Sequence, residues 1–360
     1  MNKLAYLSLI FLVLLFIACD RKGAKDPNFL FEIQLGEKYG YIDKEAKIAI
    51  NPQFDEAWRF SEGLAAVKIG DKWGFIDKTG RIVINLQFDE VWGFSEGLAP
   101  VRVGDKWGYI NKEGRTVINP QFKRIYWSFS DGLSVFEIGG KYGYIDRKGN
   151  VAINPQYDGA GMFREGLAPI NYDGKIMEEA WKFPESYLLK EVKTQGAFFE
   201  GGKCGYIDRK GRTVISPQFD NAGIFSEGLA AVRIGEKWGF VDKTGRIVIN
   251  PQFDLAWRFS EGLALVEIGE KWGFIDRTGR VVISPRFDAA WMFSEGLAAV
   301  RIDDRWDFID REGKTVLSPP VNFAGWFSNG LANMTVGDEQ GYINRRGDLY
   351  LGRFIWGENK

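Results

Sequence analysis

The protein is a chain of 360 residues with 45% hydrophobic residues, 15% aromatic residues and no histidine. Its 47 lysines and arginines nearly balance 48 aspartates and glutamates, and the net charge of -1 provides no electrostatic attraction toward nucleic acid. The lack of imidazole excludes Ser-His-Asp triads, Cys-His dyads and histidine-bearing zinc sites, whereas carboxylate pairs and oxygen-ligated metals stay open.

The first residues predict a targeting signal. Lys3 is followed by an apolar run from Leu4 to Ile17, and a small residue, Ala18, comes next. The run is shorter than the roughly 20 residues that a membrane-spanning helix needs. Residues 1–18 are therefore predicted to be a cleaved signal peptide.

The segment Phe16-Ile17-Ala18-Cys19 resembles the lipobox of bacterial lipoproteins, with phenylalanine where leucine is usual. The resemblance implies that Cys19 is diacylated and that residues 19–28 tether the protein to a membrane of the bacterial cell envelope, outside the cytoplasm. Inner and outer membranes both stay open. An ordinary secretory signal with an incidental cysteine is the alternative. Once Cys19 is lipidated only Cys204 remains, so no intramolecular disulfide is expected.

The rest of the chain is a tandem repeat with a period of about 34 residues. The hairpin sequence KWGFIDKTGR at Lys72 recurs along the chain with small changes, which gives nine units. One interval is longer by about 28 residues and marks an insertion at residues 171–202. Glycine marks eight units and aspartate marks one: Gly40, Gly74, Gly108, Gly143, Gly205, Gly239, Gly273, Gly341 and Asp307.

Each unit predicts three short β-strands joined by turns. In the second unit they cover Leu64 to Ile69, Trp73 to Ile76 and Ile82 to Ile84, with alternating or β-prone residues. The third strand is expected to stop at Asn-Pro, as at Asn51-Pro52, because proline cannot donate to a strand ladder. No stretch has the sustained period of a long helix.

Several short motifs recur together over residues 29–357: Trp-Gly, aromatic-Ile-Asp, Val-Ile, Pro-Gln-Phe-Asp and Phe-Ser-Glu-Gly-Leu. This compound signature resembles the WG (KWG) repeat family of bacterial proteins. The resemblance implies a repeat fold and brings no catalytic residues with it.

The predicted fold is all-β, with nine three-stranded β-hairpin units in an open β-solenoid-like stack. A closed propeller-like ring is the alternative. It is less favoured because a propeller blade usually has about four strands and 40 or more residues. In addition, no strand is visibly exchanged between the first and last units.

Two sets of tryptophans recur. The tryptophans of the Trp-Gly motif are predicted to be core, because each unit keeps a bulky or apolar group there, including Cys204 as a small hydrophobe. The second set alternates with glycine at 161, 223 and 325, which predicts partial exposure. Its members could stack on sugar rings, or they could simply cover the edge of a groove: Trp58, Trp92, Trp127, Trp257 and Trp291.

The recurring acids are predicted to be structural. One aspartate or asparagine precedes each hairpin turn, as at Asp77, whereas calcium needs six or more converging oxygens. The glutamate of Phe-Ser-Glu-Gly-Leu, as at Glu62, is interpreted in the same way. No metal site, cofactor or catalytic residue is therefore predicted.

The insertion at 171–202 breaks the repeat and is rich in apolar residues. Long insertions in a regular scaffold are usually functional or disordered, and this composition argues against disorder. A protein-binding site is predicted there, and a packed ornament is the alternative. The candidate contact residues are Met177, Trp181, Phe183, Tyr187 and Leu188.

Taken together, the sequence predicts a non-catalytic repeat protein, anchored to a membrane by lipid, that offers a protein-binding or scaffolding surface. The alternative is a carbohydrate-binding or weakly carbohydrate-active surface protein that uses the second tryptophan set. A third interpretation is purely structural. A protein partner is expected, a glycan is possible, and nucleic acid is not expected.

Overall fold

The computed structural model describes residues 26, 28–125, 128–176, 199–337 and 339–351, and within these ranges the regular elements are all β-strands. The chain divides into two compact units. The terminal unit comprises Gly23–Gly139, Gly143–Pro155 and Asn329–Lys360, and the central unit comprises Met1–Lys22, Gly140–Tyr142 and Gln156–Ser328.

The terminal unit contains the first fourteen strands, the last of which reaches two residues into the central unit, and the three strands at the end of the chain. They are β1 (Phe31–Leu35), β2 (Lys38–Ile42), β3 (Ile48–Phe54), β4 (Glu56–Ala57), β5 (Ala65–Ile69), β6 (Lys72–Ile76), β7 (Ile82–Phe88), β8 (Glu90–Val91), β9 (Leu98–Val103), β10 (Lys106–Asn111), β11 (Thr116–Phe122), β12 (Leu133–Ile138), β13 (Lys141–Asp146), β14 (Val151–Tyr157), β32 (Leu331–Val336), β33 (Glu339–Asn344) and β34 (Leu349–Leu351).

The central unit contains the strands between these two groups. They are β15 (Gly159–Ala160), β16 (Leu167–Ile176), β17 (Phe199–Asp208), β18 (Thr213–Phe219), β19 (Asn221–Ala222), β20 (Leu229–Ile234), β21 (Lys237–Asp242), β22 (Ile247–Phe253), β23 (Leu255–Ser260), β24 (Leu263–Ile268), β25 (Lys271–Asp276), β26 (Val281–Phe287), β27 (Ala289–Ala290), β28 (Ala298–Ile302), β29 (Arg305–Ile309), β30 (Thr315–Leu317) and β31 (Phe323–Ser328).

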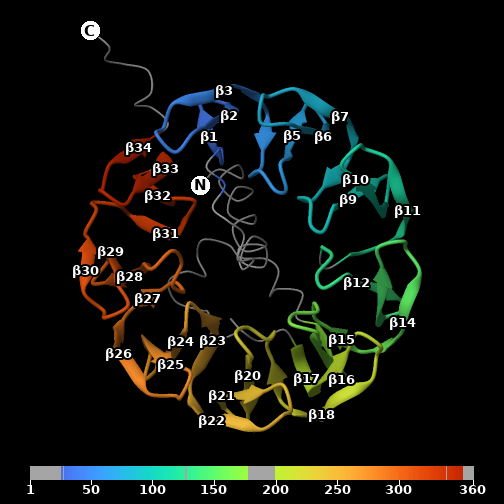
Figure 1. Cartoon of the computed structure of the whole chain (residues 1–360), viewed down its shortest axis with the longest axis vertical. Coiled ribbons are helices and arrows are strands. Elements are labelled where there is room, and N and C mark those ends of the chain that lie inside the picture. The colour runs from blue at the N-terminus through green and yellow to red at the C-terminus, as the bar shows by residue number, and fades with distance from the viewer. Residues whose placement is uncertain (1–25, 27, 126–127, 177–198, 338, 352–360) are drawn as a thin grey trace. The chain divides into compact units, whose positions relative to one another are not determined.

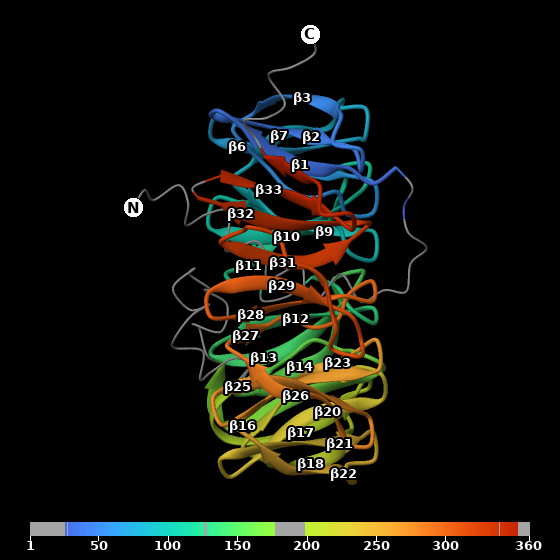
Figure 2. The same cartoon turned by 90° about the vertical axis from the view of Figure 1, so that its left-hand side faces the viewer.

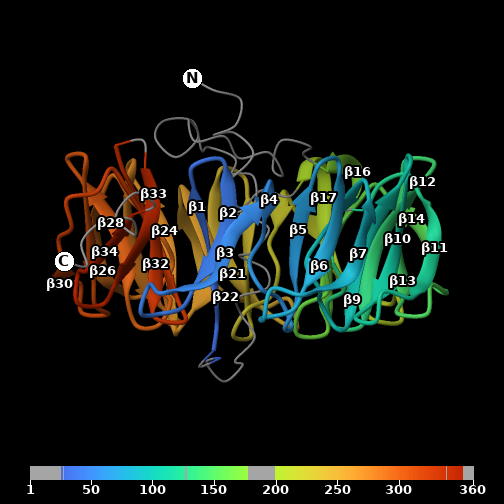
Figure 3. The same cartoon turned by 90° about the horizontal axis from the view of Figure 1, so that it is seen from above.

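The strands form nine antiparallel sheets, one for each repeat, and every sheet follows chain order (Figure 1). Seven sheets have four strands in the described residues, as in β4-β5-β6-β7, and the sheets β1-β2-β3 and β12-β13-β14 have three. Strands β5, β6 and β7 run side by side (Figure 3). We call each sheet a blade, its short first strand the lead strand and its fourth strand the last strand.

The prediction of three-stranded units is wrong, because a lead strand precedes the three expected strands in seven blades. Strand β4 pairs with β5 through Glu56↔Lys68 and Ala57↔Val67 alone. Two residues are too few to produce an alternating sequence pattern. The last strand also runs through Pro52 instead of stopping there, because a register shift in the pairing of β2 with β3 leaves the proline outside the ladder.

The prediction of an open stack is also wrong, because the first and last blades pack against each other within the terminal unit. Their shared core cluster joins Phe31 and Ile33 of β1 to Leu331 and Tyr342. The rings of Phe31 and Tyr342 lie 5.2 Å apart, and the Tyr342 hydroxyl donates to the backbone oxygen of Glu32 at 2.9 Å. Strands β1 and β33 lie side by side in Figures 1 and 2. The ends of an open nine-unit stack could not meet, so the repeats are the blades of a nine-bladed β-propeller.

The glycine of the Trp-Gly motif is required by a close backbone crossing. A Cβ atom on Gly74 would lie 2.5 Å from the backbone oxygen of Ile84 on the last strand, closer than any real contact. Where Asp307 replaces the glycine, the last strand β30 shortens to three residues. The Asp307 carboxylate there accepts hydrogen bonds from Arg305 and Ser318.

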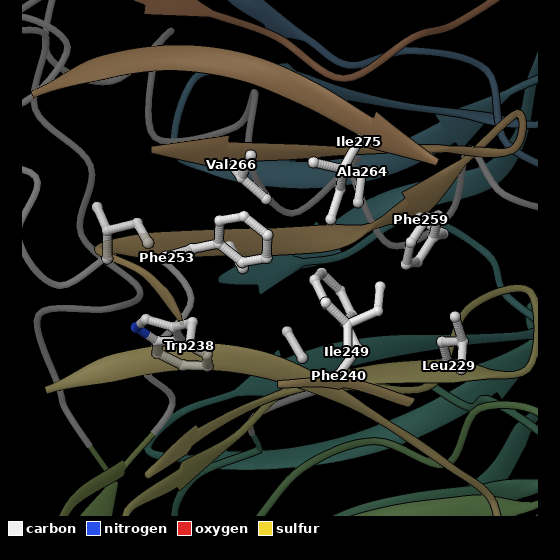
Figure 4. Close-up of a cluster of buried hydrophobic side chains, with 12 residues drawn as sticks. Leu229, Trp238, Phe240, Ile249, Phe253, Phe259, Ala264, Val266 and Ile275 are labelled. Carbon is white, nitrogen blue, oxygen red and sulfur yellow. The ribbon is translucent and has the colours of Figure 1, made fainter. Parts of the chain in front are cut away.

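Neighbouring blades are held together by apolar layers between them. Phe240 of β21 meets Phe259 of β23 with ring centroids 5.0 Å apart, and Trp238 belongs to the same cluster. Figure 4 shows Phe240 and Ile249 of one sheet facing side chains of the next. A ring pair in the same arrangement joins Phe75 to Phe94 at 5.0 Å. Each blade thus buries its apolar surface only with the help of its neighbours.

Candidate functional site

Several predicted functional residues lie outside the described residues, so the structure does not place them. They are Cys19, Trp127, Met177, Trp181, Phe183, Tyr187 and Leu188.

The tryptophans of the Trp-Gly motif lie in the core, as predicted. Trp73, Trp107 and Trp238 are buried, and Trp272 is partly buried against two core clusters. Cys204 occupies the same position in its blade and is fully buried, and burial raises the pKa of its thiol to about 12. A thiol with this pKa stays protonated at neutral pH, which favours the packing role over a reactive one.

The described members of the second tryptophan set are half-buried, which confirms the expected partial exposure. Each of the three with a recorded ring contact covers another ring: Trp58 lies 4.9 Å from Trp73, and Trp92 lies 5.7 Å from Trp107. Trp291 lies 5.8 Å from Trp326 and donates from Nε1 to the backbone of Ala324. Trp257 packs on the cluster that contains Trp272. These indoles therefore serve as partial covers of the blade core.

The aspartates before the hairpin turns cap those turns, as predicted. Asp77 Oδ1 accepts hydrogen bonds from the backbone N–H of Thr79 at 2.9 Å and of Arg81 at 3.2 Å, and also from the Thr79 hydroxyl. These hydrogen bonds hold the pKa of Asp77 below its usual value, although burial acts in the opposite direction. In the part of the chain that the structure describes, no group of three or more acids or cysteines could hold a metal ion.

The glutamate of Ser-Glu-Gly-Leu has a role that the sequence interpretation missed. Ser61 and Leu64 exchange two backbone hydrogen bonds around Glu62 and Gly63, whose φ angles are 52° and 92°. This is a two-residue hairpin turn with both central residues left-handed, a conformation that favours Asn or Gly over Glu. The glutamate therefore occupies a strained position.

The side chain of this glutamate binds the equivalent turn of the next blade. Glu62 accepts hydrogen bonds from the N–H groups of Glu96 at 2.7 Å and Gly97 at 2.9 Å, and Lys112 lies 3.2 Å from its carboxylate. Burial raises the pKa of Glu62, but the bonds from Gly97 and Lys112 outweigh it, so the pKa lies below its usual value. A glutamate recurring in a turn position that favours Asn or Gly was the available sequence signal.

We call such glutamates turn latches. In the central unit Glu165 binds Gly228 N–H at 3.0 Å, and Glu227 binds Gly262 N–H at 3.0 Å. The recurring acids are thus part of the mechanical connection between blades.

The strongest departure from the repeat is the hairpin β16–β17, which carries the insertion. Its strands pair well beyond the point where other hairpins turn, through Gly174↔Gly201, Lys175↔Glu200 and Ile176↔Phe199. We call residues 172–176 and 199–203 the hairpin extension. Ile176 and Phe199 are buried, whereas Lys175 and Glu200 are exposed and lie 3.0 Å apart as an ion pair. One side of the extension therefore packs on the protein and the other faces solvent.

Dedicated residues anchor the hairpin extension to the blades beneath it. The fully buried Asn221 of the next blade donates from Nδ2 to the backbone oxygen of Phe199 at 2.6 Å. Asn171, also fully buried, donates to the backbone oxygen of Gly201 at 3.0 Å and contacts Cys204 Sγ at 3.2 Å. Buried amides are costly unless they are hydrogen-bonded, so their presence here indicates a specific purpose.

The blade surface beneath Phe199 is also adapted to it. A Cβ atom on Gly159 would lie 2.6 Å from the Phe199 ring. Other lead strands have larger residues at this position, such as Glu56, Glu90 and Leu255. The insertion therefore begins and ends on a purpose-built platform, and we take the platform and the hairpin extension as the candidate interaction site.

Comparison with known proteins identifies the repeat. The family model described as "WG containing repeat" matches residues 39–73, 73–107, 107–142, 142–175, 205–238, 238–272 and 272–306. No curated protein matches the chain. In the described residues, no helix is both long and apolar enough to cross a membrane.

Two solved structures illustrate the similarity of fold. The crystal structure of the eukaryotic initiation factor matches with a TM-score of 0.58 at 12% identity, covering 89% of this chain and 95% of that chain. The structure of Hsv2p from Kluyveromyces lactis matches with a TM-score of 0.39 at 7% identity, covering 71% and 92%. At 12% identity the first similarity shows the fold alone.

Proposed function

The chain belongs to the WG-repeat family, and from this premise we propose that it is a non-catalytic scaffold that binds a protein partner at the hairpin extension. The observation that carries the proposal is the anchoring of that extension by Asn171, Asn221 and the space left by Gly159. Three positions on two blades are modified to hold it, whereas the remaining hairpins close in short turns.

The engagement of the recurring acids also supports a non-catalytic role. Asp77 and its equivalents cap turns, and the turn latches bind the backbone of the next blade. A general acid or base needs an environment that separates its pKa from those of similar groups. Instead, Asp77, Asp146, Asp208, Asp242 and Asp276 all have pKa values lowered in the same direction by the same kind of turn bonding.

The experiment replaces residues 173–202 with the Gly-Glu turn that the next hairpin has at Gly235 and Glu236. Detergent-solubilised full chain and the variant are immobilised and exposed to solubilised envelope proteins and, separately, to purified envelope glycans. We expect saturable binding of a defined protein to the native chain and its loss in the variant, with unchanged circular dichroism.

A triple variant, Trp58→Ala, Trp92→Ala and Trp291→Ala, is the matched control. It should keep the protein partner. If the trimmed variant still binds the protein, the site lies elsewhere. If glycan is retained and then lost in the tryptophan variant, carbohydrate binding replaces the proposal.

The proposal includes lipid anchoring of the scaffold to the bacterial envelope through Cys19, supported by the apolar run and lipobox-like segment at residues 4–19. Acyl chains bury enough CH₂ groups to hold a soluble domain at a membrane. The Cys19→Ala variant should lose incorporation of labelled fatty acid and leave the membrane fraction. A variant that still incorporates the label would contradict this assignment.

A further inference from the structure

The first blade has no lead strand among the described residues, although its other strands match those of the neighbouring blades. In the second blade, Glu56 and Ala57 of the lead strand pair with Lys68 and Val67. The equivalent residues of the first blade, Gln34 and Ile33 of β1, pair only with β2. One edge of β1 therefore presents backbone groups of the kind that a lead strand binds elsewhere in the protein.

The order of the repeat indicates which segment belongs at that edge. Each lead strand directly follows the last strand of the preceding blade, as β4 follows β3. The first blade is preceded, in the closed series, by the blade that ends with β34, because those two blades share a core cluster. The chain continues beyond β34 with residues 352–360, GRFIWGENK.

The spacing along the chain fixes the register. The lead strand begins at one constant distance from the glycine of the preceding hairpin turn, and the same distance from Gly347 leads to Gly357. The pairs are Gly80 and Glu90, Gly149 and Gly159, Gly211 and Asn221, Gly245 and Leu255, Gly279 and Ala289, and Gly313 and Phe323.

The residue two positions before the lead strand is a buried aromatic in the other blades, and an apolar residue, Ile355, stands at this place. Phe354, one position earlier, corresponds to the exposed Gln87. The buried equivalents are Phe54, Phe88, Tyr157, Phe219, Phe253 and Phe287.

A hydrogen bond at the junction supports the same conclusion. Tyr41 donates to the backbone oxygen of Trp58 at 2.7 Å, and Tyr206 donates to that of Gly223 at 2.8 Å. Both acceptors follow the lead strand of the next blade. Tyr342 holds the equivalent position in the last blade, yet within the described residues its hydroxyl donates to Glu32 of β1 itself.

We propose that residues 352–360 supply the missing lead strand of the first blade. Gly357 and Glu358 pair antiparallel with Gln34 and Ile33 of β1, and Ile355 enters the core between the first and last blades. The chain thereby seals the junction of its repeat series with its own C-terminal segment. This inference depends on the propeller fold and is independent of the proposed scaffold function.

Cross-linking tests the register directly. In the full chain carrying Cys19→Ser, the pair Gln34→Cys and Gly357→Cys places two cysteines opposite each other, and antiparallel partners have Cα atoms about 4.5 to 5.5 Å apart, within disulfide range. Mild oxidation should give an intramolecular disulfide, detected by peptide mass. The control pair Lys68→Cys and Gly357→Cys should stay reduced, because Lys68 already faces Glu56.

The inference is overturned if the Gln34→Cys and Gly357→Cys pair stays reduced, or if the control pair cross-links equally. It is also overturned if the new thiol of Gln34→Cys instead cross-links to another protein in the envelope fraction. That last result would show that a partner's strand fills the edge.

Thermal unfolding gives a second, independent readout. Ile355→Asp should lower Tm by about 2 to 5 °C, because a carboxylate would enter the core. Phe354→Asp, at the exposed position, should leave Tm unchanged. Equal Tm values for the two variants would contradict the burial of Ile355.

Discussion

The hairpins β16–β17 and β20–β21 occupy the same place in consecutive blades, and their difference shows how a repeat accommodates an insertion. Both begin in the same way, with an aspartate of the preceding segment accepting a backbone N–H at the start of the turn. Asp158 accepts from Asp173 at 3.1 Å, and Asp220 accepts from Gly235 at 2.7 Å. Beyond this point β20–β21 closes at once, whereas β16–β17 continues.

The continuation depends on backbone shapes that the regular hairpin lacks. Asp173, Gly201 and Gly202 all have positive φ angles, of 59°, 71° and 68°. They redirect the strands so that Ile176 and Phe199 are buried. The rest of the adaptation lies in Gly159, Asn171 and Asn221, outside the inserted residues or at their border. A repeat thus accepts an insertion by changing the surface that receives it.

The largest expected effect comes from Gly202→Ala. A Cβ atom there would lie 2.0 Å from the backbone oxygen of Tyr172, so the backbone must move and the extension should detach. We expect a loss of about 3 kcal/mol or more in unfolding free energy, measured by denaturant titration, together with new proteolytic cleavage near residue 200. Gly235→Ala is the control, because its Cβ atom meets nothing within 4 Å. It should cost only about 1 kcal/mol, from its left-handed conformation. Equal losses would contradict the comparison.

The next effect concerns the amide that anchors Phe199. Asn221→Ala removes a buried hydrogen bond of 2.6 Å and leaves the Phe199 carbonyl without that donor. Unfolding free energy should fall by about 1 to 3 kcal/mol. Asn154→Ala, at an exposed position of a last strand, should change it by less than about 0.5 kcal/mol. An unchanged stability of Asn221→Ala would show that the platform does not depend on this amide.

Turn latches should be insensitive to the insertion. Glu165→Ala and Glu227→Ala each remove a carboxylate that binds the next blade, in the modified and the regular blade respectively. Both variants should lose about 1 kcal/mol, measured as a shift in Tm of the order of 2 °C. A clearly larger loss for Glu165→Ala would mean that the hairpin extension and the latch are coupled.

The smallest effect is a dependence on pH at the start of the hairpins. Burial raises the pKa of Asp220, but Lys203 and the N–H of Gly235 outweigh it and hold the pKa below its usual value. For Asp158, Lys141 is the main cause of a similar lowering. A lowered pKa stabilises the fold above the unfolded value of about 3.9, and this contribution is lost as pH falls through the folded pKa. Tm of Asp220→Asn should therefore lie about 1 °C below that of the native chain at about pH 6, and the difference should vanish near pH 2. A difference that persists at that low pH would exclude this charge as its cause.

Much of the local structure could be predicted from sequence. The repeat period, the second and third strands of each blade, the turn-capping role of Asp77 and the burial of Trp73 and Cys204 follow from residue patterns that act over a few positions. The lead strands could not be predicted, because two residues such as Glu56 and Ala57 produce no pattern. The turn latches were missed because their acceptor and donors are separated by a whole repeat.

The sequence by itself determined an all-β chain of nine units, because each unit has the same alternation, turns and glycine crossing. Only the tertiary structure decided that the series closes, because closure depends on contacts such as Phe31 with Tyr342, which are far apart in the chain. It also decided what the buried Asn171 and Asn221 are for. An isolated amide in a sequence has no assigned partner, whereas in the folded protein its partner is set by the neighbouring blade.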